Sequence, residues 1–255
     1  MSSDFIDLTA EDLPREHLCC IIRKKPHPGV EAKRRWLGER LGEGHVFRKL
    51  PVSGTAFIEY APLETAWVPV LGDNYFYIYC LWVAGEYKGK GCGIALMESC
   101  LADARARGRS GVCMLGSKRQ KNWLSDQAFA RKFGFMTADE TAGGYELLAL
   151  SFDGSLPRFA PNAKREAIDA QELTVYYSPQ CPYIPQCVET VRQTCAENGV
   201  PVSLIEVDTL QKAKELPCPF NNLAVFYKGR FETVNLPDAA YIARILKKGS
   251  DENGV

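Results

Sequence analysis

The stretch from Tyr75 to Gly108 constrains the fold more than any other part of the sequence. It opens with an apolar, aromatic-rich run up to Val83, which predicts a buried strand. A glycine-rich turn follows at residues 88–93, with the order Lys-Gly-Lys-Gly-Cys-Gly. Apolar residues then recur at helical spacing from Ile94 until Gly108, and a glycine is a typical helix stop. The stretch therefore predicts a strand, a tight turn and a helix in direct succession.

The glycine-rich turn has the chemistry of an anion site. Gly91 and Gly93 lack the Cβ atoms that would keep a phosphate away from the backbone. The helix behind them offers unpaired N–H groups and the positive end of its dipole, and Lys88 and Lys90 add positive charge. The turn is not a P-loop, because no Gly-Lys-Ser/Thr follows, and no acidic residue about twenty positions further on indicates a dinucleotide fold. A tight strand-to-helix connection with close packing is the alternative interpretation.

The same residues resemble motif A of the GNAT family of N-acetyltransferases, in which a basic residue or Gln precedes x-x-G-x-G/A. Residues 88–93 have this form, and the preceding Leu81-Trp82-Val83 and the following helix also match the family. Further on, residues 129–135 resemble motif B, where a helix ends in a Gly-Phe pair. With two motifs in the right order, the chain is identified as a GNAT member. The resemblance implies an α/β (α+β) fold with a mixed sheet and flanking helices.

The composition is that of an ordinary soluble enzyme. The 255 residues leave room for one large domain or two smaller ones, and 31 basic against 31 acidic residues give no net charge. That balance gives no electrostatic case for nucleic acid or an anionic membrane as a partner. No apolar run approaches the roughly 20 residues of a membrane span, and the N-terminus lacks a signal-peptide pattern. We therefore expect a cytoplasmic protein, monomer or homodimer, whose ten cysteines are free thiols.

The first part of the chain, residues 1–152, is predicted to form the GNAT-like domain. A basic run at residues 33–35, with Arg40, falls on a predicted helix face, where a solvated surface is the usual reason and a partner or substrate role the alternative. The three histidines show no ligand spacing, so we expect no metal. Besides the central unit, we expect strands at residues 5–9, 45–50, 55–60, 112–115 and 144–152, and helices at residues 9–22 and 30–41.

The pattern changes after residue 152. A polar, proline-bearing stretch at residues 153–171 is predicted as a linker, and residues 172–250 as a second domain. The second domain has a β-α-β then β-β-α order that resembles the thioredoxin fold, without its usual Cys-x-x-Cys. We expect strands at residues 173–177, 202–207, 223–227 and 231–235, and helices at residues 184–197 and 238–247.

Three cysteines of the second domain are candidate reactive thiols. Cys181 is predicted at a helix N-terminus, where the dipole stabilises a thiolate. Cys187 lies six residues further on, too far for an unstrained bridge across a helix. Cys218 could approach Cys181, as a redox pair or as soft-metal ligands. The other interpretation is a thioredoxin-like module that has lost redox chemistry and packs or recognises substrate.

A GNAT-like part followed by a thioredoxin-like part with a CPYIPQC run resembles the bacterial YoaP-type acetyltransferases. The resemblance implies acetyl-CoA as donor and direct transfer to a primary amine, carried by a small molecule or a peptide. In the family, the strand before motif A pairs with the pantetheine arm, the motif A amides hold the pyrophosphate, and a polar loop residue touches the CoA arm. The corresponding residues are Leu81, Trp82, Val83, Lys88, Gly89, Lys90, Gly91, Cys92, Gly93, Ile94, Asn122 and Ser125.

The catalytic residues depart from the family pattern. Many GNAT enzymes carry a tyrosine as general acid four residues before the motif B glycine, and this chain has Ala130 there. Glu59 could act as a base through water, Tyr79 could point into the cleft, and Glu86 lies just before motif A. The rival hypothesis is a thiol-redox or soft-metal-responsive protein that uses Cys181, Cys187 and Cys218, with CoA as a regulatory ligand.

Overall fold

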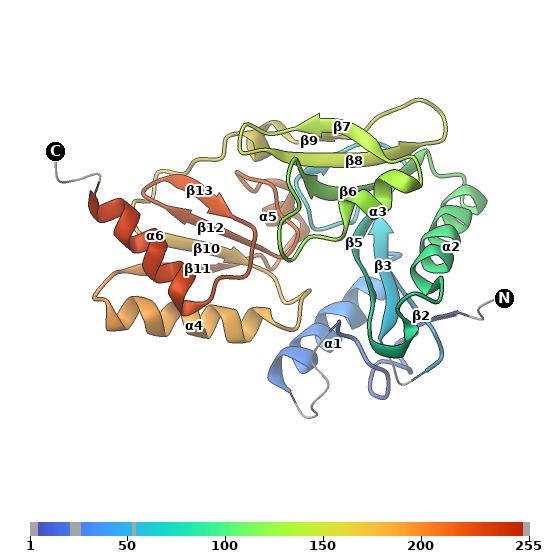
Figure 1. The fold of residues 1–255 in the computed structure, drawn as a ribbon, viewed down its shortest axis with the longest axis horizontal. Coiled ribbons are helices and arrows are strands. Elements are labelled where there is room, and N and C mark those ends of the chain that lie inside the picture. Colours follow the sequence, from blue (N-terminus) through green and yellow to red (C-terminus); the bar gives the residue numbers. More distant parts are fainter. Residues whose placement is uncertain (1–4, 21–26, 53–54, 252–255) are drawn as a thin grey trace.

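Two mixed sheets lie side by side in the computed structural model, which describes residues 5–20, 27–52 and 55–251 (Figure 1). The large sheet has the order β1-β2-β3-β5-β6-β8-β7, with only β5 and β6 parallel. The predicted α/β class, a mixed sheet with flanking helices, is confirmed. The strands of this sheet are β1 (Ile6–Asp7), β2 (Val46–Lys49), β3 (Ala56–Pro62), β5 (Tyr75–Val83), β6 (Gly111–Ser117), β7 (Met136–Glu140) and β8 (Tyr145–Ser151).

The two faces of the large sheet pack against different elements because side chains alternate along each strand. Phe76 and Ile78 face α2 (Cys92–Ala106), in a cluster that also takes Ala130 of α3 (Gln127–Lys132). Tyr75, Tyr77 and Tyr79 face the opposite way, in the cluster that contains Trp36 and Leu37 of α1 (Pro28–Leu41). Strand β5 is thus buried on both faces along its first half.

The small sheet has the order β11-β10-β12-β13, with β10 and β11 parallel and the other pairs antiparallel. One face packs against α4 and α6, and the other face joins the core of the large sheet. The predicted element order is present, with one further short helix, and the name thioredoxin-like stays a prediction. The elements are β10 (Leu173–Tyr177), α4 (Ile184–Glu197), β11 (Val202–Glu206), α5 (Leu210–Lys214), β12 (Leu223–Tyr227), β13 (Arg230–Thr233) and α6 (Ala239–Asp251).

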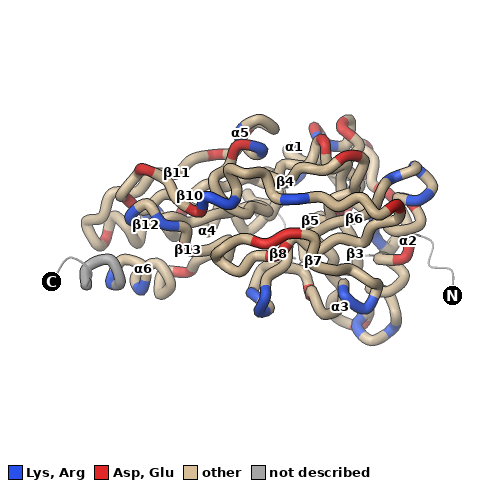
Figure 2. The backbone as a smooth tube through the Cα atoms, turned by 90° about the horizontal axis from the view of Figure 1, so that it is seen from above, with Lys and Arg blue, Asp and Glu red and all other residues tan. Residues whose placement is uncertain are grey.

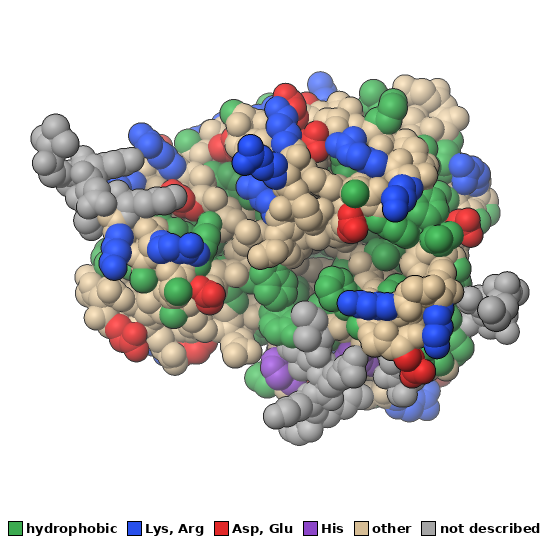
Figure 3. Space-filling model, viewed as in Figure 1, with side chains coloured by type: hydrophobic (Ala, Val, Ile, Leu, Met, Phe, Trp, Pro, Cys, Tyr) green, Lys and Arg blue, Asp and Glu red, His purple; other side chains and the backbone are tan. Residues whose placement is uncertain are grey.

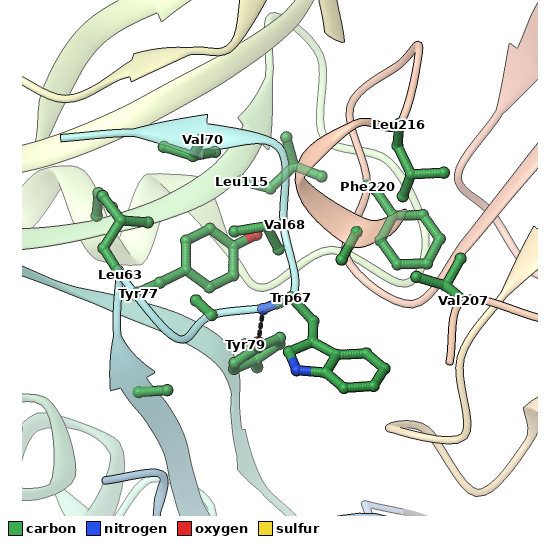
Figure 4. Packing of buried hydrophobic residues seen from close by; sticks show 14 of the residues in the cluster. Leu63, Trp67, Val68, Val70, Tyr77, Tyr79, Leu115, Val207, Leu216 and Phe220 are labelled. Carbon is green, nitrogen blue, oxygen red and sulfur yellow. Dashed lines mark hydrogen bonds between the residues drawn. The ribbon is translucent and has the colours of Figure 1, made fainter. Parts of the chain in front are cut away.

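The N-terminal part (residues 5–152) and the C-terminal part (residues 172–251) share one hydrophobic core. Figure 4 shows Leu216 and Phe220 of the C-terminal part close to Trp67 and Val68 of the N-terminal part, all of them buried. The contact is close at Gly29, where a Cβ would lie 1.8 Å from the carbonyl oxygen of Pro182. Only glycine lets α1 approach the C-terminal part this closely.

The segment predicted as a linker, residues 153–171, carries two short elements of its own. Strand β9 (Arg158–Phe159) pairs with β4 (Val70–Leu71), and the 3₁₀ turn η2 (Pro161–Lys164) follows. Asn162 donates to the carbonyl oxygens of Lys214 and Leu216 at 2.9 and 2.8 Å. The segment is therefore tied to both parts, and the division into two domains stays a prediction.

Two local predictions are wrong. The helix predicted from Thr9 is a series of turns as far as residue 16, because Leu8, Leu13 and Leu18 reach the core without helical spacing; its end, residues 21–22, lies outside the described residues. Lys33 was expected on a solvated face and is only 1% exposed. Basic and acidic residues are otherwise interspersed over both parts (Figure 2). In the part of the chain that the structure describes, no helix is long and apolar enough to cross a membrane.

Candidate active site

Strands β5 and β6 separate in the middle of the large sheet. Their parallel ladder ends at the pair Ile78 and Met114, although β5 continues to Val83. On its other side β5 has a bulge, since Glu59 pairs with Cys80 and the next pair joins Tyr60 to Ile78. A bulge bends the strand and increases its twist. The second half of β5 therefore turns away from β6 and leaves backbone groups free for another partner.

A first cavity opens where the two strands separate, in front of the glycine-rich turn. We call it the glycine-turn cavity; its volume is about 530 Å³. Gly89 and Gly91 have φ values of +74° and +78°, in the left-handed region that favours glycine. A Cβ on either residue would meet no atom within 4 Å, so the space in front of the turn is open. The lining residues include Leu81, Val83, Tyr87, Lys88, Gly91, Cys92, Gly93, Ser125, Phe129 and Ala130.

The turn leads directly into α2. Gly91 is the N-cap and makes no side-chain capping bond, so the first amides of α2 lack a side-chain acceptor. These amides and Lys88 give this end of the cavity a positive character. The other end is apolar. This arrangement fits a ligand with an anionic end and an extended, less polar arm.

A second cavity lies on the other side of β5, with a volume of about 350 Å³. We call it the thiol-lined cavity, because Cys19, Cys20, Cys80 and Cys181 all face it. It meets the glycine-turn cavity at two residues that line both, Leu81 and Ser125. Figure 3 shows a hollow with hydrophobic side chains between the two parts of the molecule. The other lining residues include Leu18, Lys33, Phe57, Glu59, Tyr79, Trp82, Asn122, Trp123, Gln180, Asn221 and Asn222.

A buried network of polar groups forms one wall of the thiol-lined cavity. Glu59 on β3 is 2% exposed and forms an ion pair with Lys33 of α1, itself 1% exposed. His45 Nε2 donates to the same carboxylate oxygen at 2.9 Å, and Gln180 Nε2 donates to the other oxygen at 2.9 Å. Both oxygens of Glu59 thus accept from protein donors, and one donor comes from the C-terminal part.

The network fixes the protonation of its members. Burial alone would raise the pKa of Glu59, but the charge of Lys33 and the hydrogen bond from His45 outweigh it and lower the pKa to about 2. Burial lowers the pKa of His45 despite the nearby carboxylate, which favours a neutral imidazole. Glu59 is therefore a permanent anion and a weak base at neutral pH.

The C-terminal part also holds the bulged strand. Asn221 Nδ2 donates to the Tyr79 carbonyl oxygen at 3.2 Å, and its Oδ1 accepts from the Tyr77 hydroxyl at 2.9 Å. Asn222 Nδ2 donates to Gln180 Oε1 at 3.3 Å, which links this contact to the Glu59 network. Both Asn221 and Gln180 are buried. The bulged middle of β5 is therefore positioned by residues more than a hundred positions away in the sequence.

Most of the residues predicted for cofactor binding line the glycine-turn cavity, and three do not. Trp82 and Asn122 line the thiol-lined cavity instead; for Trp82 the reason is that residues of β5 alternate between its two sides. Lys90 is exposed and outside the lining of both cavities. Ser125 lies at the boundary, where its hydroxyl accepts from the Leu81 N–H at 3.4 Å.

The predicted catalytic residues are spread over different surroundings. Tyr79 lines the thiol-lined cavity, but its hydroxyl accepts from the Trp67 N–H at 2.6 Å (Figure 4), and burial raises its pKa. Glu86 is exposed on the 3₁₀ turn η1 (Gly85–Tyr87), outside the lining of either cavity. Glu59, like Tyr79, is buried beside the thiol-lined cavity, and both of its oxygens already accept hydrogen bonds.

The structure does not bring Cys218 to the cavity that Cys181 faces. Cys181 faces the thiol-lined cavity before α4, and burial raises its pKa to about 12, opposite to the lowering expected at a helix N-terminus. Burial also raises the pKa of Cys187 to about 12 and that of Cys218 well above its usual range. Cys218 lies in the shared core, away from the cavity lining. None of the ten cysteines forms a disulfide, and the described residues contain no cluster suited to a metal ion.

Several residues of the site were missed in the sequence. Lys33 lies in a basic run that resembles a solvated surface, and His45, Gln180 and Asn221 stand in no motif. Cys19 and Cys20 precede a proline-rich stretch and give no local signal. Each of these residues reaches the cavity through tertiary packing, which a single sequence does not reveal.

Comparison with known proteins decides the family. A model of the acetyltransferase (GNAT) family matches residues 11–135, and a YoaP-like model matches residues 201–244. The uncharacterized N-acetyltransferase YoaP of Bacillus subtilis (strain 168) is 35% identical over 232 residues, 90% of this chain and 92% of that protein. The chain belongs to the GNAT family of N-acetyltransferases. The predicted resemblance is confirmed in both parts of the chain, and the rival thiol-redox hypothesis gains no support from these matches.

Solved GNAT structures are similar to part of the chain. A GNAT family acetyltransferase from Brucella melitensis, in complex with acetyl-CoA, has a TM-score of 0.41 and 16% identity over 61% of this chain and 91% of its own. The PaiA N-acetyltransferase from Thermoplasma acidophilum, in complex with coenzyme A, has a TM-score of 0.40 and 18% identity, over 60% of this chain and 100% of its own.

Proposed function

We propose that this GNAT enzyme transfers the acetyl group of acetyl-CoA directly to a primary amine. Acetyl-CoA occupies the glycine-turn cavity, and the acceptor occupies the thiol-lined cavity. The observation that carries the proposal is the junction of the two cavities at Leu81 and Ser125, beside the bulge of β5. A donor and an acceptor bound on the two sides of this strand meet there.

The residues of the glycine-turn cavity suit each portion of acetyl-CoA. The open left-handed turn and the first amides of α2 bind the pyrophosphate, and Lys88 adds a cation. The Leu81 carbonyl and the backbone of Val83 pair with the amides of the pantetheine arm, in the space that β6 leaves. Acetyl-CoA supplies the thioester, which is already activated for attack by an amine.

Ser125, at the boundary between the two cavities, has one O–H donor that is available to the substrates. Its oxygen accepts from the Leu81 N–H, and a hydroxyl keeps its own O–H as a donor. We assign it the role of donating to the leaving sulfur, in place of the tyrosine that Ala130 replaces. Glu59 holds Lys33, His45 and Gln180 in place and acts as a fixed anion in the cavity wall, since its low pKa makes it a weak base.

A glycine at each end of α2 provides the test. Gly91 and Gly108 both have left-handed φ values, +78° and +61°, and a Cβ at either would meet open space. Gly91→Asp places a carboxylate where the pyrophosphate binds, so we expect calorimetric titration to show at least a hundredfold weaker acetyl-CoA binding. Gly108→Asp puts the same strain and charge at the far end of the helix and should bind acetyl-CoA like wild type.

The proposal fails if wild-type protein does not bind acetyl-CoA, or if Gly91→Asp binds it as tightly as Gly108→Asp does. With binding established, release of free CoA in the presence of a panel of primary amines measures the transfer itself. Wild type should release CoA with at least one amine, and Gly91→Asp should release none.

A further inference from the structure

A third hollow continues the thiol-lined cavity across the C-terminal part. We call it the C-terminal groove; its volume is about 530 Å³, and it lies between the start of α4 and the chain around the start of α6. Asn122 and Trp123 line both this groove and the thiol-lined cavity. The glycine-turn cavity, the thiol-lined cavity and the C-terminal groove are therefore consecutive, with shared residues at each boundary.

The passage between cavity and groove is built around Trp123. This residue has a φ of +68°, which is uncommon for a large side chain, and it is 41% exposed. Its ring packs edge-on against Tyr183 of the C-terminal part, with 5.3 Å between ring centroids. A partly exposed aromatic pair at the mouth of a cavity offers an apolar surface to whatever passes through it.

The lining of the groove beyond this passage includes amides and aromatic rings, and also the charged residues Asp238 and Arg244. Asn122, Gln186 and Asn235 each carry a donor and an acceptor, the combination that matches a peptide backbone. The Oδ1 atom of Asn235 is buried and accepts no hydrogen bond from the described residues. Tyr241 adds an aromatic surface from α6. The groove is therefore suited to an extended chain with regularly spaced amides.

The thiol-lined cavity favours an amine that is already neutral in solution, because the cavity offers no good proton acceptor. The two oxygens of Glu59 accept from Lys33, His45 and Gln180, which leaves a poor proton acceptor. Burial raises the pKa of the Cys181 thiol to about 12, so it too is a poor proton acceptor at neutral pH. An α-amine has a pKa of about 7.7–8.0 and is partly neutral near pH 8, whereas a lysine amine at about 10.4 is almost fully charged.

We propose that the acceptor is the α-amine of a peptide chain, which enters past Trp123 with its first residue in the thiol-lined cavity and its next residues in the C-terminal groove. This inference rests on the proposed function and specifies its substrate class. The neutral amine forms the C–N bond of the new amide while the C–S bond of the thioester breaks. The amine loses one proton to water, the leaving sulfur takes one proton from the Ser125 hydroxyl, and water restores that hydroxyl.

The test compares alaninamide, which ends within the thiol-lined cavity, with a pentapeptide amide that begins with alanine and has a free α-amine. In wild type, we expect kcat/KM to be at least tenfold higher for the pentapeptide, and to level off near pH 8. The double variant Gln186→Ala with Asn235→Ala should raise the pentapeptide KM about tenfold and leave alaninamide turnover unchanged. Gln193→Ala, an exposed residue of the same helix outside the groove, should change neither.

A second peptide distinguishes the two kinds of amine. It carries one lysine and a formylated α-amine, and we expect no acetylation of it by mass spectrometry. Acetylation of that lysine, or equal pentapeptide KM values for wild type and the double variant, would overturn the peptide proposal. Turnover of alkyl amines without any turnover of free α-amine peptides would overturn it as well and leave the proposed function intact. Absence of CoA release with every amine tested would overturn both.

Discussion

The glycine-turn cavity and the thiol-lined cavity meet at Leu81 and Ser125, yet they are built in opposite ways. The first is formed mainly by one continuous stretch, from β5 through the turn to α2. The second is formed by side chains from α1, β3, β5 and the C-terminal part, which only the tertiary fold brings together. A local motif is enough to bind acetyl-CoA, the donor that the family shares. Binding a particular acceptor needs a surface assembled from distant segments.

The two cavities also differ in how they carry charge. The glycine-turn cavity offers amides, a helix terminus and one lysine to an anion that comes from outside. The thiol-lined cavity contains its own anion, Glu59, already neutralised by Lys33. A buried ion pair is costly to break by removing one member, because the other is left as an uncompensated charge. The comparison therefore predicts that substitutions in the second cavity affect folding, while those in the turn affect binding.

The largest expected effect is that of Lys33→Met. Removing this ammonium leaves the Glu59 carboxylate buried with only neutral partners, so we expect the free energy of unfolding in urea to fall by about 3–5 kcal/mol. Lys212→Met, which breaks the half-exposed pair with Asp208, should cost less than about 1 kcal/mol. Adding Glu59→Gln to Lys33→Met should restore stability. If Lys33→Met lowered the free energy of unfolding no more than Lys212→Met does, the buried network would not stabilise the fold.

A smaller effect is expected for Gln180→Leu, which removes the contact of the C-terminal part with the network. One oxygen of Glu59 then lacks its donor, and an unsatisfied buried group of this kind costs about 1–3 kcal/mol of unfolding free energy. Gln193→Leu, on the exposed face of α4, is the matched control and should change stability by no more than about 0.5 kcal/mol. Equal stabilities for the two variants would mean that the C-terminal part does not support the cavity wall.

The smallest effect is expected for Cys218→Ala. Cys218 is buried in the shared core and lines neither cavity, so CoA release with an accepted amine should stay within twofold of wild type. Cys195→Ala, a buried thiol of α4, serves as the control for simple loss of packing. A much greater loss in Cys218→Ala than in Cys195→Ala would favour the rival thiol-redox hypothesis.

The sequence predicted the parts of the molecule that are determined locally. Strand β5, strand β10 and helix α4 have the predicted bounds, because each is a short run with clear periodicity and clear stop signals. The glycine turn could be predicted for the same reason. The helix expected after Thr9 failed, since the acidic residues that resemble a helix start there lie in turns that bring leucines to the core.

The acceptor side could not be predicted in the same way. Lys33 looks like one of several surface cations in the sequence. It can be buried only because the Glu59 carboxylate lies beside it and compensates its charge. Gln180 contacts β3 and Asn221 contacts β5 across more than a hundred residues, so no spacing rule connects them to these strands. Strands β4, β7 and β9 and helix α5 were also absent from the prediction, because they are short and depend on their neighbours.

The most direct test of the account is an experimental structure of the protein with CoA bound. The account predicts the pyrophosphate against the amides of residues 88–93, and the pantetheine arm along the second half of β5. The thiol should lie at the boundary marked by Leu81 and Ser125, facing the thiol-lined cavity. CoA bound elsewhere, or with its thiol directed away from that boundary, would contradict the claim that the two cavities form one active site.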